Sequence, residues 1–252
     1  MSNSMYMLAA GLFLPLFPLS MPFNVVYTHI RNPFLRSLIL LLWPQVGLGI
    51  ISSFGVTVPV WIAVWSLVTS LLYAVRALAL REVGLWTSFV GTSAWALLWI
   101  LLSNEIPLLQ VMLYALAVSV PLVLMTLLTS GLEERFGAAY LGLYGGLGES
   151  IPRFTGVLVV VVLAIVATPL FPAFFAMLSM ILRAIPKTPF VAIGIAAVWL
   201  LWSWAGARLL QGLLVGPANT AVPDLSRSAL LMYVIVLGGL MIAGVYWSGL
   251  MV

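Results

Sequence analysis

The chain has 252 residues, of which 64% are hydrophobic and 6% are charged, with a net charge of +4 and no cysteine. Soluble domains carry about 25% charged residues, so this composition indicates a polytopic membrane protein whose apolar surface faces lipid. The lack of cysteine excludes disulfides, thiolate metal sites, iron–sulfur clusters and cysteine nucleophiles, and the scatter of the basic residues over separate loops argues against a nucleic-acid partner.

Apolar runs of about 20 residues, separated by charges and Pro/Gly clusters, predict the membrane spans. There are eight of them, at residues 5–24, 34–53, 57–78, 84–103, 106–130, 154–182, 188–214 and 229–250. No basic residue precedes the first run and no small-residue cleavage pattern follows it, so we expect a first span there and not a removable signal. The expected fold is an all-α membrane bundle of about eight transmembrane helices, with residues 1–252 forming a single domain.

The basic residues predict the orientation of the bundle. Eight spans place the loops on alternating sides, and one side collects Arg31, Arg36, Arg76, Arg81, Arg135, Arg153, Arg208 and Arg227. The other side has only Arg183 and Lys187. Because basic loops stay in the cytoplasm, we expect the loops near residues 30, 80, 140 and 220 to be cytoplasmic and both termini to lie outside.

Prolines predict broken helices in three spans. They are Pro15, Pro18 and Pro22 in the first span, Pro44 in the second, and Pro169 and Pro172 in the sixth. Each proline removes a backbone donor where no water is present, so the freed carbonyl needs a neighbouring helix or a hydrated cavity. Discontinuous helices are a usual setting for ion sites in transporters, but proline is also commoner in membrane helices generally. The breaks alone leave both interpretations open.

Five polar residues are candidates for an ion pathway: His29, Gln45, Arg76, Glu82 and Arg208. His29 either titrates near neutral pH or lies at the interface, and Gln45 either holds a water or bonds the carbonyl freed by Pro44. Arg76 and Glu82 stand near a helix end, where they set orientation or admit protons. Arg208 lies either at the cytoplasmic interface with its stem snorkelling or buried against an acidic neighbour.

The remaining motifs favour structural roles. Glu149 and Arg153 flank Pro152 and are expected to cap the sixth span, and the ten tryptophans fit interfacial belts and helix packing better than a cofactor site. The sequence has no Gly-rich phosphate loop, metal-ligand cluster or nucleophile triad. We therefore expect no catalytic residue, no metal and no cofactor, and no enzymatic activity of the isolated chain.

Five segments, in order along the chain, resemble one family. "PLFPLSMPFNVVYTHIRNPF" (residues 15–34) is similar to the broken helix and following loop that open the second half of the antiporter-like membrane subunits of respiratory complex I and of Mrp-type cation/proton antiporters. "LREVGLWTSFVGTSAW" (80–95), the segment 132–182 with its second break, "ARLLQGLLVGP" (207–217) and the last span (223–246) are similar to later parts. The resemblance covers essentially the whole chain and corresponds to about the final eight of the family's customary fourteen spans.

The resemblance also implies which titratable groups to look for. In this family, protons are thought to move along buried lysines, histidines and a glutamate near mid-membrane. The family's lysine in the second of these spans falls at or beside Pro44, the basic residue of the fourth at or near Glu82, and the titratable residue past the second break near Met177. The one lysine, Lys187, lies in a predicted outer loop. The resemblance therefore implies a shortened subunit without the usual proton route.

Two functions follow as hypotheses. The first is a subunit of an energy-coupling complex for proton, cation or inorganic-carbon translocation, which serves as a scaffold or half channel in the bacterial inner membrane. Its partners would be other membrane subunits, the lipid bilayer and a soluble catalytic partner. The alternative is an autonomous small ion or solute transporter that acts as a homodimer.

Overall fold

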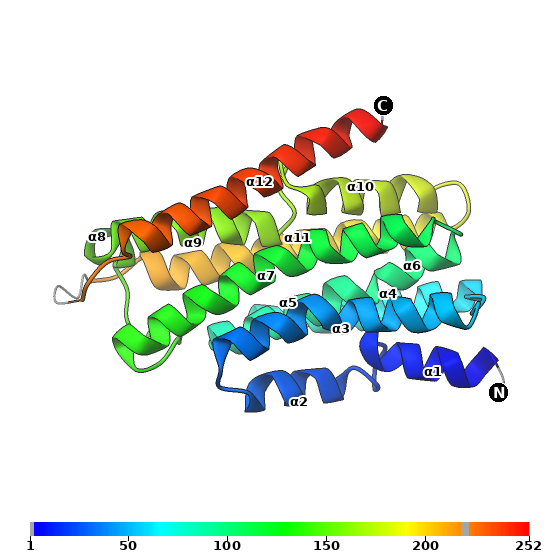
Figure 1. The fold of residues 1–252 in the computed structure, drawn as a ribbon, viewed down its shortest axis with the longest axis horizontal. Helices are drawn as coiled ribbons and strands as arrows, with labels where there is room; N and C mark the ends of the chain where they lie inside the picture. Colours follow the sequence, from blue (N-terminus) through cyan, green and yellow to red (C-terminus); the bar gives the residue numbers. More distant parts are fainter. Residues whose placement is uncertain (1–2, 218–221, 252) are drawn as a thin grey trace.

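A computed structural model describes residues 3–217 and 222–251, which fold into the all-helical bundle of Figure 1. The helices are α1 (Asn3–Phe13), α2 (Met21–His29), α3 (Pro33–Ser53), α4 (Val60–Ala79), α5 (Val83–Ala96), α6 (Leu98–Ser103), α7 (Leu108–Phe136), α8 (Leu147–Ser150), α9 (Pro152–Ile165), α10 (Pro172–Ala184), α11 (Pro189–Leu214) and α12 (Arg227–Met251). The predicted all-α class is confirmed.

Six segments are long and apolar enough to cross a membrane: α3, α4, α5 with α6, α7, α11 and α12. The other two predicted spans are pairs of half-helices, α1 with α2 and α9 with α10. The predicted boundaries agree to within a few residues, with two exceptions: α2 continues to His29, and α7 continues to Phe136. Helix α7 ends at Gly137, whose φ of 78° is left-handed. The start of α1 and the end of α12 lie toward the same end of the bundle (Figure 1).

Helix α7 runs through the middle of the bundle and packs against α3, α5, α9 and α10. Helix α4 lies between α5 and α11, while α1 and α2 form one edge and α12 the opposite edge (Figure 1). Burial follows this order, since 89% of the apolar window in Val83–Ser103 is buried inside the protein and only 17% of that in Arg227–Trp247. Helix α12 is therefore attached along one side and open on the other.

The predicted interruption at Pro44 is wrong, because α3 continues through it from Pro33 to Ser53. A single proline removes one N–H group and bends a helix, whereas the true interruptions hold two prolines three residues apart. Pro15 and Pro18 lie between α1 and α2, and Pro169 lies before Pro172, the first residue of α10. A second intrahelical proline, Pro121, lies in α7 without ending it.

Candidate functional site

The first helix interruption is closed by tryptophans. Three indole N–H groups from other helices donate to its carbonyl oxygens: Trp43 of α3 to Leu12 at 3.2 Å, Trp65 of α4 to Phe17 at 2.8 Å, and Trp99 of α6 to Leu14 at 2.9 Å. The N–H group of Phe17 donates in turn to Oγ1 of Thr69 at 3.1 Å. The backbone groups freed by Pro15 and Pro18 are thus satisfied by protein groups, as the absence of water in a bilayer requires.

The second interruption is closed in the same way. Nε1 of Trp199 on α11 donates to the carbonyl oxygen of Val166 at 3.0 Å, and the hydroxyl of Thr168 donates to Leu163 at 3.0 Å. Ala167 and Leu170 have φ values of 56° and 97°, in the left-handed region that non-glycine residues rarely adopt. Besides packing between helices, four tryptophans therefore donate hydrogen bonds to backbone carbonyls at the two interruptions.

A polar stripe faces inward from the second half of the broken helix. Ser20, just before α2, and Asn24 and Tyr27 within it bond three different helices: Ser20 and the Tyr73 hydroxyl of α4 at 2.8 Å, Asn24 and the donating Thr92 hydroxyl of α5 at 3.3 Å, and Tyr27 and the Thr126 hydroxyl of α7 at 2.8 Å. Spacings of four and three residues place these three side chains on one helix face. The stripe leads from the first interruption toward the charged cluster described next.

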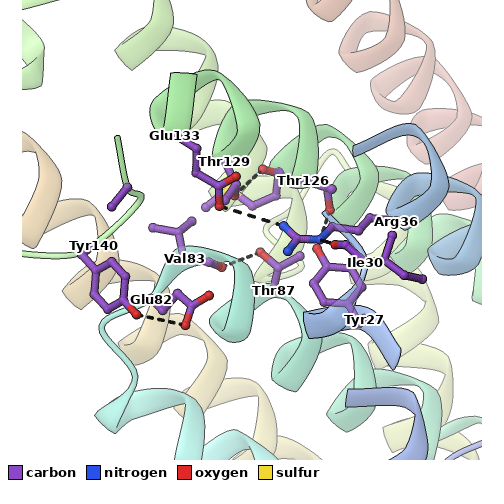
Figure 2. Close-up of polar contacts among 12 residues, drawn as sticks. Tyr27, Ile30, Arg36, Glu82, Val83, Thr87, Thr126, Thr129, Glu133 and Tyr140 are labelled. Atoms are coloured by element: carbon purple, nitrogen blue, oxygen red, sulfur yellow. Dashed lines mark hydrogen bonds and ion pairs between the residues drawn. The ribbon is translucent and has the colours of Figure 1, made fainter. Parts of the chain in front are cut away.

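Charged side chains from α3, α7 and the start of α5 meet at the end of this stripe (Figure 2). Nη1 of Arg36 lies 4.0 Å from Oε1 of Glu133, and its guanidinium carbon lies 5.3 Å from the ring centroid of Tyr27. The guanidinium also donates to the carbonyl oxygen of Ile30. On the other side, Glu82 accepts a hydrogen bond of 3.3 Å from the Tyr140 hydroxyl.

Gly84 lies between the two halves of this cluster. A Cβ atom there would lie 3.8 Å from Nη1 of Arg36 and 3.8 Å from Oε1 of Glu82, so both groups come within van der Waals distance of the same position. The negative charge of Glu82 raises the pKa of the exposed Tyr140 hydroxyl. We call Arg36, Glu82, Glu133 and Tyr140 the charged cluster.

Of the predicted site residues, only Glu82 belongs to the charged cluster. His29 is exposed, with Nδ1 2.9 Å from the Val25 carbonyl oxygen. Arg76 is exposed too, and its guanidinium carbon lies 5.5 Å from the Phe89 ring centroid. Within the described residues, no hydrogen bond or ion pair joins any two of the five candidates.

Gln45 and Arg208 bond backbone carbonyls of neighbouring helices. Nε2 of Gln45 donates to Met112 of α7 at 3.1 Å, so the expected bond to the carbonyl freed by Pro44 is not the one formed. Arg208 is exposed and donates to the carbonyl oxygen of Leu78, near the end of α4. Of the two alternatives for Arg208, burial against an acidic neighbour is thus wrong.

The start of α9 is capped by a residue that the sequence analysis missed. The carboxylate of Asp224 accepts from the backbone N–H groups of Arg153 at 3.0 Å and Phe154 at 3.1 Å, so the expected caps Glu149 and Arg153 are wrong. Burial opposes the charge of Asp224, but these two groups, the N–H of Leu225 and the guanidinium of Arg153 outweigh it and lower the pKa of the carboxyl. No local pattern predicts this cap, because Asp224 lies 70 positions from Phe154 in the chain. The polar stripe, in contrast, is predictable from the spacing of Ser20, Asn24 and Tyr27 by four and three residues.

The described interior lacks carboxylates, lysines, arginines and histidines. In residues 4–217 and 222–247, the buried polar side chains other than tyrosine and tryptophan are all serine or threonine. Met177, where the resemblance predicts a titratable group, is 3% exposed. The same part of the chain holds no group of three or more His, Cys, Asp or Glu side chains that could bind a metal ion.

These features define an integral membrane protein, a helical bundle with two discontinuous helices. Its fold is that of chains from three solved membrane complexes. A chain of respiratory complex I from Thermus thermophilus with bound NADH matches with a TM-score of 0.86 and 19% identity, over 97% of this chain and 54% of that one. A chain of the Mrp complex from Dietzia sp. DQ12-45-1b matches with a TM-score of 0.78 and 18% identity, over 90% and 44%.

A chain of the membrane-bound sulfane sulfur reductase, an archaeal respiratory membrane complex, matches with a TM-score of 0.79 and 16% identity, over 96% and 52%. No family model and no curated protein matches the sequence. The chain therefore spans about half the length of the solved chains it resembles. The fold predicted from the resemblance to complex I and Mrp subunits is confirmed.

Proposed function

We propose that this chain is a membrane subunit of a larger ion-translocating complex and that it acts as a scaffold or half channel, not as a complete proton path. The observation that carries this proposal is the chemistry of the two helix interruptions. Their carbonyls are bonded by Trp43, Trp65, Trp99 and Trp199, and the described interior has no buried acid or base to take up a proton. Hydroxyl groups can relay a proton but do not hold one near neutral pH.

The charged cluster is the surviving polar entrance in this proposal. Arg36, Glu82 and Glu133 are the ionisable groups at the end of the α2 stripe, and we assign that end to the cytoplasm by the positive-inside rule. The bacterial inner membrane is the proposed location. A half channel would end at the first interruption, where the indole N–H groups of Trp65 and Trp99 donate to backbone carbonyl oxygens that would otherwise bind water.

The partners follow from the same proposal. Full-length membrane subunits would supply the complete proton or cation path, and a soluble catalytic partner would supply any redox or hydration chemistry, so the isolated chain is not an enzyme. The complex is a redox-driven pump, a cation/proton antiporter or an inorganic-carbon uptake system. Genes adjacent to this one for a redox module, for Mrp components or for a zinc-containing carbonic-anhydrase-like protein would choose among the three.

Purification in mild detergent followed by reconstitution tests the proposal. We expect the chain to come out with other polypeptides, and the isolated chain to move no protons in liposomes loaded with a pH-sensitive dye. The alternative, an autonomous homodimeric transporter, predicts a dimer of this chain alone that dissipates a proton or cation gradient. That second result would overturn the subunit proposal.

A further inference from the structure

Helices α9 and α12 leave an open groove of about 440 Å³ between them. One wall comes from α9 and the other from α12, and the lining is apolar except for Arg153 at one end: Pro152, Arg153, Gly156, Val157 and Val160 on α9, and Leu230, Val234, Leu237, Gly238 and Met241 on α12. Gly156 and Gly238 hold the groove open, because a Cβ atom at either one would meet nothing within 4 Å. Helix α12, which forms one wall, lies at an edge of the bundle (Figure 1), and only 17% of its apolar window is buried inside the protein.

The length of the groove matches one leaflet of a bilayer. From Leu230 to Met241 the α12 wall rises about 16 Å at 1.5 Å per residue, and half of a hydrocarbon core about 30 Å thick is about 15 Å. The α9 wall, from Pro152 to Val160, rises about 12 Å. Both helices begin at the same end, because Asp224, just before α12, bonds the first N–H groups of α9. The apolar walls therefore extend inward from the membrane surface that Arg153 occupies.

Arg153 presents an exposed guanidinium at the mouth of this groove, where its charge also acts on the nearby Asp224 carboxylate. The side chain is exposed, and within the described residues its guanidinium makes no hydrogen bond and no ion pair within 4.0 Å. Asp224 lies nearby, but its two carboxylate oxygens already accept from three backbone N–H groups. Arg227, at the start of α12, adds a second exposed positive charge at this end.

We propose that the α9–α12 groove binds one anionic phospholipid, with an acyl chain along its walls and the phosphate on Arg153. The positive-inside orientation proposed above places Arg153 at the cytoplasmic leaflet, whose anionic lipids attract basic residues next to membrane helices. A seated acyl chain would cover the more open apolar lining of the groove, including Val234, which is 54% exposed. Charge on Arg153 favours a phospholipid over a partner helix as the occupant.

Native mass spectrometry of the full chain tests this site. The chain is purified in mild detergent, incubated with phosphatidylglycerol or phosphatidylcholine, and the retained lipids are counted. We expect one strongly retained phosphatidylglycerol per chain. Arg153→Gln lowers the preference for phosphatidylglycerol over phosphatidylcholine about fivefold, the equivalent of about 1 kcal/mol for one basic residue at an anionic surface. Arg31→Gln, at an exposed site outside the groove, leaves the preference unchanged.

Filling the groove is the second arm. Gly238→Leu places a side chain between the walls and abolishes the strongly retained lipid, while Gly49→Leu, at an equally open site on α3, retains it. Gly156→Leu repeats the test from the opposite wall if Gly238→Leu fails to fold by circular dichroism. Wild-type retention in both groove variants, or equal loss in Gly49→Leu, overturns the proposal.

The proposal is also overturned if Gly238→Leu releases a polypeptide from the purified complex while the lipid count stays unchanged. The groove would then bind a partner helix and not a lipid. These measurements need no transport, so their result is independent of the proposed function.

Discussion

The indole Nε1 of Trp99 lies 2.9 Å from the carbonyl oxygen of Leu14, and both residues are completely buried, 85 positions apart in the chain. Leu14 follows directly after α1, where the helix stops supplying backbone partners. The indole of Trp99 therefore satisfies one of the buried carbonyls of the first interruption in place of a water.

Replacing Trp99 by Phe keeps the ring volume nearly constant and removes the donor. A buried carbonyl without a partner costs about 1–3 kcal/mol, so we expect Trp99→Phe to lower the free energy of unfolding by about that amount in detergent. Thermal or chemical unfolding followed by circular dichroism measures it. Trp204→Phe is the matched control, because Trp204 is 59% exposed and makes no hydrogen bond within the described residues. Equal stability of Trp99→Phe and Trp204→Phe would contradict the role of the indole.

The Tyr27 hydroxyl holds α2 to α7 through Thr126. We expect Tyr27→Phe to cost about 1 kcal/mol of stability, because Thr126 keeps its own bond to the Leu122 carbonyl and the phenyl ring keeps its contact with Arg36. The same unfolding assay reports the change. Tyr246→Phe, at a side chain that is 68% exposed, should be neutral; a loss there as large as in Tyr27→Phe would assign the effect to the assay.

Gln45 is predicted to be a packing residue. Its amide donates to the carbonyl of Met112, which lies within α7 and does not depend on Gln45 for a partner. Gln45→Leu is therefore expected to leave coupled transport by the purified complex unchanged and to alter its assembly at most modestly. Loss of transport with normal assembly, seen as a collapsed gradient signal in proteoliposomes, would show that Gln45 carries part of a polar route.

Arg208 is predicted to have a structural role, which depends on its positive charge and on one hydrogen bond from its side chain to the Leu78 carbonyl. Lysine keeps both, so Arg208→Lys should support wild-type transport and assembly, whereas Arg208→Leu removes the bond to the Leu78 carbonyl and costs about 1–3 kcal/mol. Proton uptake by vesicles that contain each variant complex distinguishes a structural role of Arg208 from a role in transport. A transport defect in Arg208→Lys with normal subunit content would make Arg208 part of the ion path.

Asp224 makes the attachment of the last loop pH-dependent. Its pKa is lowered in the folded protein, so its stabilising contribution is present above the ordinary value of 3.8 and is lost as the pH falls through the lowered value. We expect Asp224→Asn to melt below wild type at pH 7 and the difference between the two melting temperatures to begin to narrow once the pH falls below 3.8. Glu149→Gln is the control, since Glu149 is exposed and its side chain makes no hydrogen bond within the described residues. If the difference in melting temperature stays undiminished at low pH, the loss of stability in Asp224→Asn comes from the shape of the side chain and not from its charge.

Much of this architecture could be predicted from local properties of the chain. Runs of about 20 apolar residues form helices because lipid offers no partner to a backbone N–H, and closely spaced prolines end a helix because they remove neighbouring donors. Pro15 with Pro18 and Pro169 with Pro172 obeyed that rule. Pro44 stands alone in its span, and α3 continues through it because a single lost donor does not end a helix.

The sequence by itself determined the membrane class, the apolar segments that form the long helices and the scarcity of lysine and histidine, since each of these depends on composition and spacing along one segment. It predicted the two interruptions together with a third, at Pro44, that the structure lacks. Tertiary structure decided which groups close the interruptions, because Trp99 and Leu14 are distant in the chain and become neighbours only when the fold places α6 beside the first interruption. It also assigned the α9 cap to Asp224 and brought Arg36 to Glu133. Hydrogen bonds and ion pairs act over a few ångströms, so only the folded chain selects their partners.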